Sequence, residues 1–350
     1  MSEITSEILS LIADAVIIAK GGRIELANPA AKALLGEDCT GRRVSAVFGR
    51  ELAESQSSDY IANASLAGKS CILHVSKKGS NTTFIIREEA GDIEIINDAF
   101  ICSMRSSLNL LMSSADRCRL TKGEECDPML SAALASLTKS IYITANHISN
   151  LSYTRNIFED KLEYFPVPTD LAELCREYAD YSQSMLDVRI EVEAAAPVIC
   201  AVDEKLFAAL FANLISNAVS HGKADRITLR LSENAENAVV TFTDNGAGIP
   251  SDKLINVFER YRAPFTLGEL YNGAGLGLTV VRGIAARHGG TLLLESREGS
   301  GTSVHVSLRK TLVGTISMRS TDANISYTRD LMTGLSKCMD AEKFGKKYMD

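Results

Sequence analysis

Hydrophobic and polar positions in the first part of the chain form short runs that are typical of strands. The runs AVIIA and RIEL flank a Gly-Gly pair at 21–22, and an alanine-rich stretch that begins near Asn28 predicts a helix. Strand-like runs return at CILHV and TTFIIRE. We therefore expect a small α+β domain over residues 1–95. His74 and Cys39 are its single candidates for a cofactor ligand, although an isolated histidine or cysteine is more often structural.

The next segment, residues 96–160, has apolar positions at helical spacing. They fall in two stretches: Phe100, Met104, Leu108, Leu111 and Met112, then Ile141, Ala145, Ile148 and Leu151. The polar run TKGEECDP between them predicts a turn, so the segment is expected to be a hairpin of two long helices. An apolar stripe on each arm needs a partner. We therefore expect a homodimer in which two hairpins form a four-helix bundle.

From residue 161 to residue 310, helix-like and strand-like stretches alternate. Two amphipathic helices are predicted at LAELCREYADYSQSML and DEKLFAALFANLISNAVSHG, and strands at ITLRLS, AVVTFTD, TLLLES and TSVHVSL. A third helix, LGLTVVRGIAARHGG, ends at a glycine pair, with His288 expected as a cation at its C-terminus. The pattern predicts an α/β sandwich with helices on one face of a mixed sheet. Residues 311–350 are polar with helix-like pieces and a basic end, and they suggest no function.

Composition narrows the class of protein. The chain has 350 residues, 45% of them hydrophobic and 23% charged, as in soluble globular proteins of two or three domains. Its net charge of −7 gives no sign of a nucleic-acid surface. The eight cysteines include no CxxC pair, which argues against a zinc or redox motif. Apolar runs are too short to span a membrane, and no signal peptide is apparent, so a cytoplasmic location is expected.

Polar side chains between residues 213 and 277 suit a phosphate ligand and a metal ion. Asn213 and Asn217 lie four residues apart on one helix face, with His221 next in that row. Amide oxygens are suitable Mg²⁺ ligands beside phosphate and water. The run TDNGAGIP leaves a strand with one carboxylate, Asp244, and two glycines that suit either a turn or a closely bound ligand. Three glycines of the run GAGLGL precede a helix, where free backbone N–H groups meet phosphate: Gly273, Gly275 and Gly277.

The order of these runs resembles a known family. The spacing N-x-x-x-N, then DNGAGIP, then FERYR at 258–262, then GAGLGL, is similar to the N, G1, F and G2 boxes of the GHKL ATPase superfamily. Flanking residues narrow the resemblance to the catalytic domain of bacterial sensor histidine kinases, and it extends over 96–310. The resemblance implies three parts: a PAS-like α+β sensor domain at 1–95, a dimerisation hairpin at 96–160 and a GHKL (Bergerat) α/β sandwich at 161–310.

The same resemblance implies ligands and residue roles. Mg-ATP would bind with the adenine amino group on Asp244, with Mg²⁺ on Asn217 and with Asn213 supporting the phosphates. The chain would pass close to the base at Gly246 and Gly248. Residues 259–272 would form a lid, and His221 would offset the neutral side chain of Ser220. The further implied ATP-binding positions are Phe258, Arg260, Arg262, Gly273, Gly275 and Gly277.

The resemblance fails at the phosphoacceptor. In the family, the first long helix carries a histidine followed by an acid. Aligned on Phe100, the matching positions here hold Ser106 and Ser107. A shifted alignment places Cys102 at the histidine, and neither alignment supplies one. His147 on the second predicted helix is the only substitute in that region, and a structural role is favoured for it because no acid follows.

Three functions remain open from the sequence. The first is a two-component signalling protein that binds Mg-ATP but lacks autophosphorylation, with a response-regulator receiver domain as a partner. The second is an active kinase that phosphorylates His147, a serine or another protein. The third is a GHKL ATPase outside signalling, against which the PAS-like segment and the hairpin argue. The sensed signal does not follow from the sequence.

Overall fold

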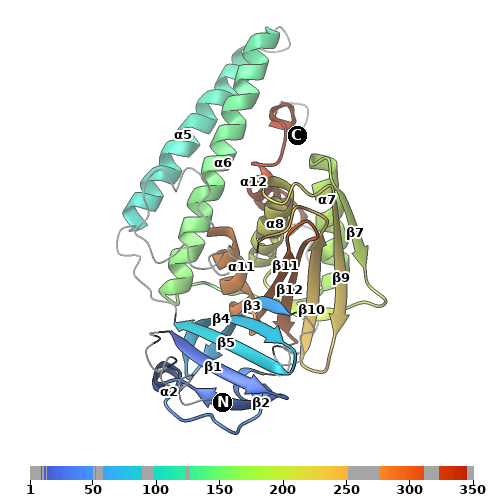
Figure 1. The fold of residues 1–350 in the computed structure, drawn as a ribbon. Helices are drawn as coiled ribbons and strands as arrows, with labels where there is room; N and C mark the ends of the chain where they lie inside the picture. The colour runs from blue at the N-terminus through green and yellow to red at the C-terminus, as the bar shows by residue number, and fades with distance from the viewer. Residues whose placement is uncertain are drawn as a thin grey trace.

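A single ten-stranded sheet runs through the computed structural model, which describes residues 9, 12, 14–49, 52, 58–88, 98–122, 127–250, 276–310 and 323–344. The strand order is β2-β1-β5-β4-β3-β11-β12-β10-β9-β7. All neighbouring strands are antiparallel except β7 and β9, which are parallel. The first five strands in this order come from the N-terminal part of the chain and the other five from the C-terminal part (Figure 1).

The N-terminal part is a five-stranded antiparallel sheet with two short helices. Its elements are β1 (Ala15–Lys20), β2 (Arg23–Ala27), α2 (Pro29–Leu35), α3 (Val44–Phe48), β3 (Asp59–Leu66), β4 (Lys69–Lys78) and β5 (Asn81–Glu88). The buried Asn28 side chain joins sheet and helix, because its Oδ1 accepts hydrogen bonds from the backbone N–H groups of Val16 and Ala31. Stacked rings of Phe48 and Phe84, with centroids 4.4 Å apart, tie α3 to the sheet. The expected strands and the helix start at Asn28 are therefore confirmed.

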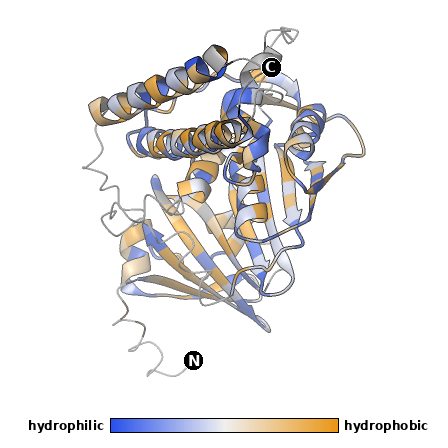
Figure 2. Ribbon diagram, turned by 90° about the horizontal axis from the view of Figure 1, so that it is seen from above, coloured by the Kyte–Doolittle hydropathy of each residue, from blue (hydrophilic) through white to orange (hydrophobic). Residues whose placement is uncertain are grey.

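Two long helices follow, α5 (Asp98–Lys122) and α6 (Pro128–Phe158), and they lie side by side (Figures 1 and 2). Asp127 caps α6 by accepting a hydrogen bond from Met129 N at 3.2 Å. Ile101, Met104 and Leu108 of α5 pack in one cluster with Ile148 and Leu151 of α6. Of the predicted apolar row, Met104 and Leu108 pack towards α6, whereas Phe100 and the neighbouring Leu111 are both 49% exposed.

The C-terminal part is a sheet covered on one face by helices, as expected (Figure 1). Its elements are β6 (Val167–Asp170), α7 (Leu171–Met185), β7 (Arg189–Glu193), β8 (Ile199–Val202), α8 (Glu204–Ser220), β9 (Arg226–Glu233), β10 (Asn237–Asp244), α11 (Leu276–Arg287), β11 (Leu292–Arg297) and β12 (Gly301–Arg309). β6 and β8 form a separate two-stranded sheet. Asp170 and Asp203 cap α7 and α8 through hydrogen bonds from Ala172 N and Leu206 N. Alternating burial along β10 places Val240 and Phe242 in the core under α8.

The two halves of the sheet meet at β3 and β11. Ala62 pairs with Leu293 and Ile61 with Leu294, both in antiparallel register. Ile61 is buried in the core of the C-terminal part, whereas Leu293 packs against the core of the N-terminal part. Strand β3 therefore contributes Ile61 to the C-terminal core, and strand β11 contributes Leu293 to the N-terminal core.

The last segment packs against the C-terminal part. It consists of α12 (Ala323–Leu335) and a 3-10 turn, η4 (Ala341–Phe344). Its apolar side chains are buried in the same core as α8: Leu331, Met332, Leu335, Met339 and Phe344. A Cβ at Gly334 would lie 2.4 Å from the Cβ of Ala212, so α12 approaches α8 closely only because residue 334 is a glycine. Within the described part of the chain, no helix is long and apolar enough to span a bilayer.

Candidate nucleotide-binding site

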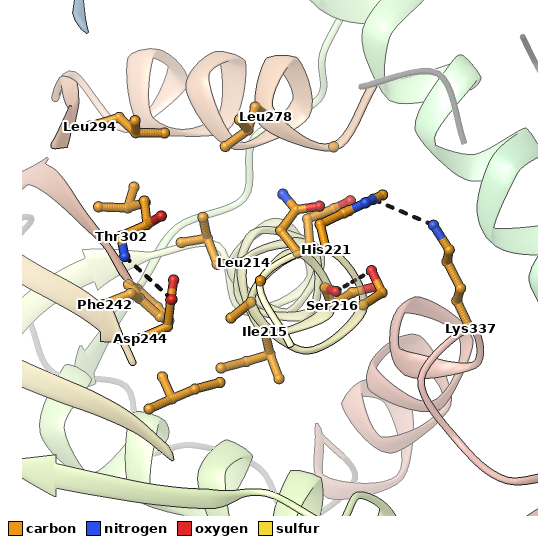
Figure 3. A pocket seen from close by; sticks show the side chains of 18 of the residues that line it. Leu214, Ile215, Ser216, His221, Phe242, Asp244, Leu278, Leu294, Thr302 and Lys337 are labelled. Atoms are coloured by element: carbon orange, nitrogen blue, oxygen red, sulfur yellow. Dashed lines mark hydrogen bonds between the residues drawn. The ribbon is translucent and has the colours of Figure 1, made fainter. Parts of the chain in front are cut away.

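A cavity of about 480 Å³ opens between α6, α8, the start of α11 and the ends of strands β10 and β12 (Figure 3). This volume is in the range of small-molecule sites. Its walls are apolar where Phe242, Ile249 and Leu278 contribute, and amides, hydroxyls and rings line the remainder. Six of the site residues that the sequence predicts, from the region of α8, the exit of β10 and the start of α11, line this one cavity: Asn213, Asn217, His221, Asp244, Gly248 and Gly277.

Asp244 lies at the exit of β10 with one carboxylate oxygen fixed and the other available. Oδ1 accepts hydrogen bonds from Gly246 N at 2.8 Å and from Thr302 N at 3.3 Å. Oδ2 has no partner among the residues that the structure describes. Burial raises the pKa of this carboxyl above its ordinary value, and the two backbone hydrogen bonds oppose that shift. A half-buried carboxylate of this kind can accept a hydrogen bond from a ligand.

The two glycines after Asp244 are required by backbone packing. A Cβ at Gly246 would lie 2.4 Å from the carbonyl oxygen of Gly222. Gly248 has a φ of 67°, and its Cβ would lie 2.1 Å from the carbonyl oxygen of Arg297. These contacts give the glycines a structural role beside the predicted close approach to a base.

The two asparagines of α8 differ in their surroundings. Asn213 is buried and exchanges hydrogen bonds with Asn150 of α6, while Asn217 has no side-chain partner in the described part of the chain. Gly277 lies against both amides, because its Cβ would be 2.8 Å from Asn213 Oδ1 and 3.6 Å from Asn217 Nδ2. Asn217 therefore presents its amide to the cavity, and Asn213 does so only at its edge.

Asn217 suits a magnesium ion that arrives with a nucleotide. Mg²⁺ binds oxygen ligands and usually takes few of them from protein, the rest coming from phosphate and water. The unpaired amide of Asn217 offers one such oxygen. Within the described ranges, no cluster of three or more His, Cys, Asp or Glu residues could hold a metal ion. A magnesium ion here would therefore need the phosphate oxygens of a nucleotide as further ligands.

One end of the cavity is rich in nitrogen groups that the sequence did not bring together. His221 Nε2 lies 3.4 Å from Nζ of Lys337, which follows α12 (Figure 3). Ser220, by contrast, donates its hydroxyl to Ser216 O at 2.6 Å. His147 of α6 lines the same cavity. Its pKa is lowered mainly by burial and, to a smaller extent, by the positive charge of Lys337. Only a fold in which the C-terminal segment covers α8 could have indicated Lys337.

The predicted phosphoacceptor positions lie elsewhere. Ser106 and Ser107 are exposed on α5, and their hydroxyls donate to the carbonyl oxygens of Cys102 and Ser103, one turn earlier. Cys102 is exposed as well, and none of these residues lines the cavity. In this arrangement both alternative alignments place the acceptor position outside the described cavity wall.

The remaining predicted positions lie outside the described residues. They are Phe258, Arg260, Arg262, Gly273 and Gly275, together with the predicted lid at 259–272. One other expectation was wrong: His288 is not a C-terminal cation. It is 3% exposed, its Nε2 accepts a hydrogen bond from Asp203 N at 3.1 Å, and burial lowers its pKa.

The part of the chain that forms most of this site matches a known family. Residues 202–312 match the family described as histidine kinase-, DNA gyrase B-, and HSP90-like ATPase. This part of the chain is therefore similar to GHKL ATPase domains, and the curated relatives that the chain matches are bacterial sensor kinases.

Three curated relatives carry that relationship. The adaptive-response sensory kinase SasA of Synechocystis sp. is 30% identical over 218 residues, which are 59% of this chain and 56% of SasA. The sensor protein IrlS of Burkholderia pseudomallei is 36% identical over 132 residues, 36% of this chain and 28% of IrlS. The sensor-like histidine kinase SenX3 of Mycobacterium tuberculosis is 29% identical over 35% of this chain and 30% of SenX3. The chain thus spans about half or less of each relative.

Similar solved structures include an ATP-binding domain and a complex with AMPPNP. The ATP-binding domain of PrrB from Mycobacterium tuberculosis is 28% identical and aligns over 42% of this chain and 98% of that domain, with a TM-score of 0.34. Full-length ShkA in complex with AMPPNP is 20% identical and aligns over 62% of this chain and 46% of ShkA, with a TM-score of 0.48.

Proposed function

We propose that this chain is a sensor-kinase-like signalling protein of two-component type that binds Mg-ATP in its GHKL domain and does not phosphorylate itself at the usual position. One observation carries the proposal: the available carboxylate oxygen of Asp244 and the unpaired amide of Asn217 line the same cavity. A carboxylate can accept the adenine amino proton, and an amide oxygen can coordinate Mg²⁺ beside the phosphates. Bound Mg²⁺ would supply neutralisation of the phosphate charge.

The proposed site uses further residues around this pair. Gly277 leaves space above the two amides of α8, and the backbone at Gly248, which lines the cavity, would pass beside the base. Residues 259–272 would close over the nucleotide, with an arginine at 260 or 262 reaching the terminal phosphate. Gly273 and Gly275 would flex that lid and present backbone amides to phosphate, and Phe258 is a further proposed ATP-binding position.

The loss of autophosphorylation follows from the chemistry of Ser106. Autophosphorylation of the histidine-kinase type needs a nucleophile with a near-neutral pKa beside a base. A serine hydroxyl that donates to a helix carbonyl and is followed by another serine lacks both. A phosphoserine ester is also too stable to pass its phosphoryl group on to a regulator aspartate.

We further propose three functional parts and two partners. The N-terminal sheet at 1–95 would be a PAS-like sensor, the hairpin at 96–160 a dimerisation unit, and 161–310 the ATP-binding unit. A second copy would cover the exposed apolar side chains of the hairpin: Phe100, Leu110, Leu111, Leu120, Met129 and Leu137. A response-regulator receiver domain is the expected second partner.

Incubation with γ-labelled ATP, alone and with a receiver domain, tests this proposal. The wild-type protein should bind nucleotide but gain no acid-labile phosphate on α5. The double variant Ser106→His, Ser107→Glu should gain one, because it restores nucleophile and acid, whereas Cys102→His, Ser103→Glu should not. Label on α5 of the wild type would refute the proposal, and gain only in the Cys102 variant would show that the alignment is shifted.

One observation favours a second candidate, an active kinase that phosphorylates His147. This histidine lines the nucleotide cavity, and its lowered pKa keeps the imidazole neutral and nucleophilic at neutral pH. The imidazole would attack the γ-phosphorus of ATP, and ADP would leave. The same labelling experiment separates the candidates, since acid-labile label that disappears in His147→Ala would support this second function.

A further inference from the structure

The cavity has a strongly uneven distribution of charge. Among its lining residues that the structure describes, Asp244 is the only carboxylate and Lys337 the only lysine or arginine. They lie at opposite ends of the cavity, on either side of α8 (Figure 3). The stretch between them is lined by neutral amides, hydroxyls and apolar groups. A ligand with a hydrogen-bond donor at one end and several negative charges at the other matches this distribution.

The position of Lys337 is fixed by the packing of its neighbours. Leu335 and Ser336 before it and Met339 after it are buried. Cys338 contacts α8 directly, with Sγ 3.5 Å from Ser216 Oγ. The backbone at residue 337 is therefore held against the last turns of α8, and the flexible part of the lysine extends from there to the cavity.

The ammonium group of Lys337 has no carboxylate partner in the described ranges. Its hydrogen-bonding contact there is His221 Nε2 at 3.4 Å, and, after burial, its charge is the second cause that lowers the pKa of His147. A lysine whose only role was to anchor the C-terminal segment would be expected to face a carboxylate or a carbonyl, as Lys343 does with Ser184 O at 3.1 Å. The uncompensated positive charge at this end of the cavity favours an anionic ligand.

We propose that Lys337 binds the terminal phosphates of the nucleotide, so that the C-terminal segment completes the nucleotide site. The inference rests on the proposed function for the nature of the ligand. It gives residues 323–344, to which the sequence assigned no role, a specific one. The lysine acts as a point charge that distinguishes a nucleoside triphosphate from a nucleoside.

Calorimetric titration of the full chain with three probes tests the proposal: ATP, adenosine and inorganic tripolyphosphate. Lys337→Met should weaken ATP and tripolyphosphate binding about tenfold or more, the usual effect of losing a charge-assisted hydrogen bond, and leave adenosine affinity within about twofold. Lys337→Arg should retain most of the affinity. Lys343→Met is the matched control, because Lys343 lies in the same segment outside the cavity, and it should bind all three probes like the wild type.

The outcomes separate this inference from the proposed function. ATP affinity that is unchanged in Lys337→Met overturns the inference alone. Equal losses for ATP and adenosine, or the same losses in Lys343→Met, also overturn it, since they indicate a misplaced segment instead of a missing charge. If the wild-type protein binds ATP no more tightly than adenosine, the inference about Lys337 is overturned, while the proposed adenine site at Asp244 is retained. A wild-type protein that binds none of the probes overturns both.

Discussion

Asn150 of α6 and Asn213 of α8 form a reciprocal amide pair, with Nδ2-to-Oδ1 distances of 3.1 and 3.2 Å in the two directions. Both side chains are buried, and both line the nucleotide cavity. Asn213 therefore uses its amide N–H groups to bind Asn150 Oδ1 and Ala209 O, which holds α6 over the site, instead of donating them to a phosphate. The pair makes the position of the helical hairpin and the accessibility of the nucleotide cavity dependent on each other.

Breaking this pair should lower the stability of the fold and raise the affinity for Mg-ATP. Asn150→Ala leaves the Asn213 amide without its partner, so the free energy of unfolding should fall by about 1–3 kcal/mol in a urea titration. Mg-ATP affinity should rise, because Asn213 becomes available and α6 is no longer held over the cavity. Asn146→Ala is the control: Asn146 also lines the cavity from α6, but its side chain makes no hydrogen bond within the described part of the chain. Weaker nucleotide binding in Asn150→Ala would contradict the expected closing role.

Removal of the Asp244 carboxylate tests the assigned orientation of the nucleotide. Asp244→Ala should leave a donor on adenine unpaired and weaken ATP and adenosine binding by about 1–3 kcal/mol. Tripolyphosphate binding should be unaffected, because Asp244 lies at the far end of the cavity from Lys337. Titration calorimetry provides both values. Unchanged ATP affinity in this variant would remove the assigned role.

Protonation of His288 should limit stability at acidic pH. Its Nε2 accepts the Asp203 N–H and its Nδ1 lies 2.8 Å from Ile284 O, so the folded state holds the neutral ring with the proton on Nδ1. Because burial lowers the folded-state pKa below the ordinary value of 6.5, the unfolded chain takes up the proton first. This contribution to stability is fully present above pH 6.5 and is lost as the pH falls through the folded-state pKa.

The pH dependence of unfolding measures this effect. Urea midpoints of the wild type should fall on acidification below pH 6.5, and His288→Gln should lose that part of the slope, because glutamine can accept the Asp203 N–H without titrating. The nearby Tyr164 ring, with its centroid 4.9 Å from that of His288, is expected to stay in place. An equal slope in both proteins would assign the acid sensitivity to other groups.

The exposed apolar side chains of α5 should hold the proposed dimer together. Leu110 and Leu111 are 69% and 49% exposed, and a monomer in water would leave this face uncovered. Light scattering should show dimers for the wild type and monomers for Leu110→Glu, Leu111→Glu, with unchanged helicity. Leu108→Glu is a contrasting variant, because Leu108 packs in the cluster between α5 and α6 and its change should destabilise the hairpin itself. A monomeric wild type at micromolar concentration would refute the dimer.

Local sequence patterns were sufficient to predict most of the helices and strands and one wall of the cavity. Capping residues such as Asn28 and alternating burial in β10 act over a few residues, so the sequence displays them directly. Asn217 and Asp244 could be assigned together because the order of the family motifs connects them. The apolar row on α5 was less certain, since steps of four residues turn about 40° beyond a full helical turn and carry Phe100 away from the face of Leu108.

Contacts between distant segments could not be predicted in this way. Asn150 meets Asn213 across 63 positions, and Lys337 meets His221 across 116. Neither contact belongs to a local motif, and both depend on how helices pack around α8. His288 shows the same limit: its place at the end of a helix was foreseen, but the direction in which its side chain is buried depends on Asp203, 85 positions away.

The strand pairing between β3 and β11 has a consequence for dissecting the protein. A fragment that begins at residue 98 lacks β3, and β11 then becomes an unprotected edge strand with its N–H and C=O groups facing solvent. Such edges recruit strands from other molecules, and Leu293, which packs against the N-terminal core, would add an apolar side chain to this one. The N-terminal sheet therefore protects the edge of the C-terminal sheet from pairing with other molecules. Separate expression of the C-terminal part should yield aggregates unless charged residues are introduced on strand β11.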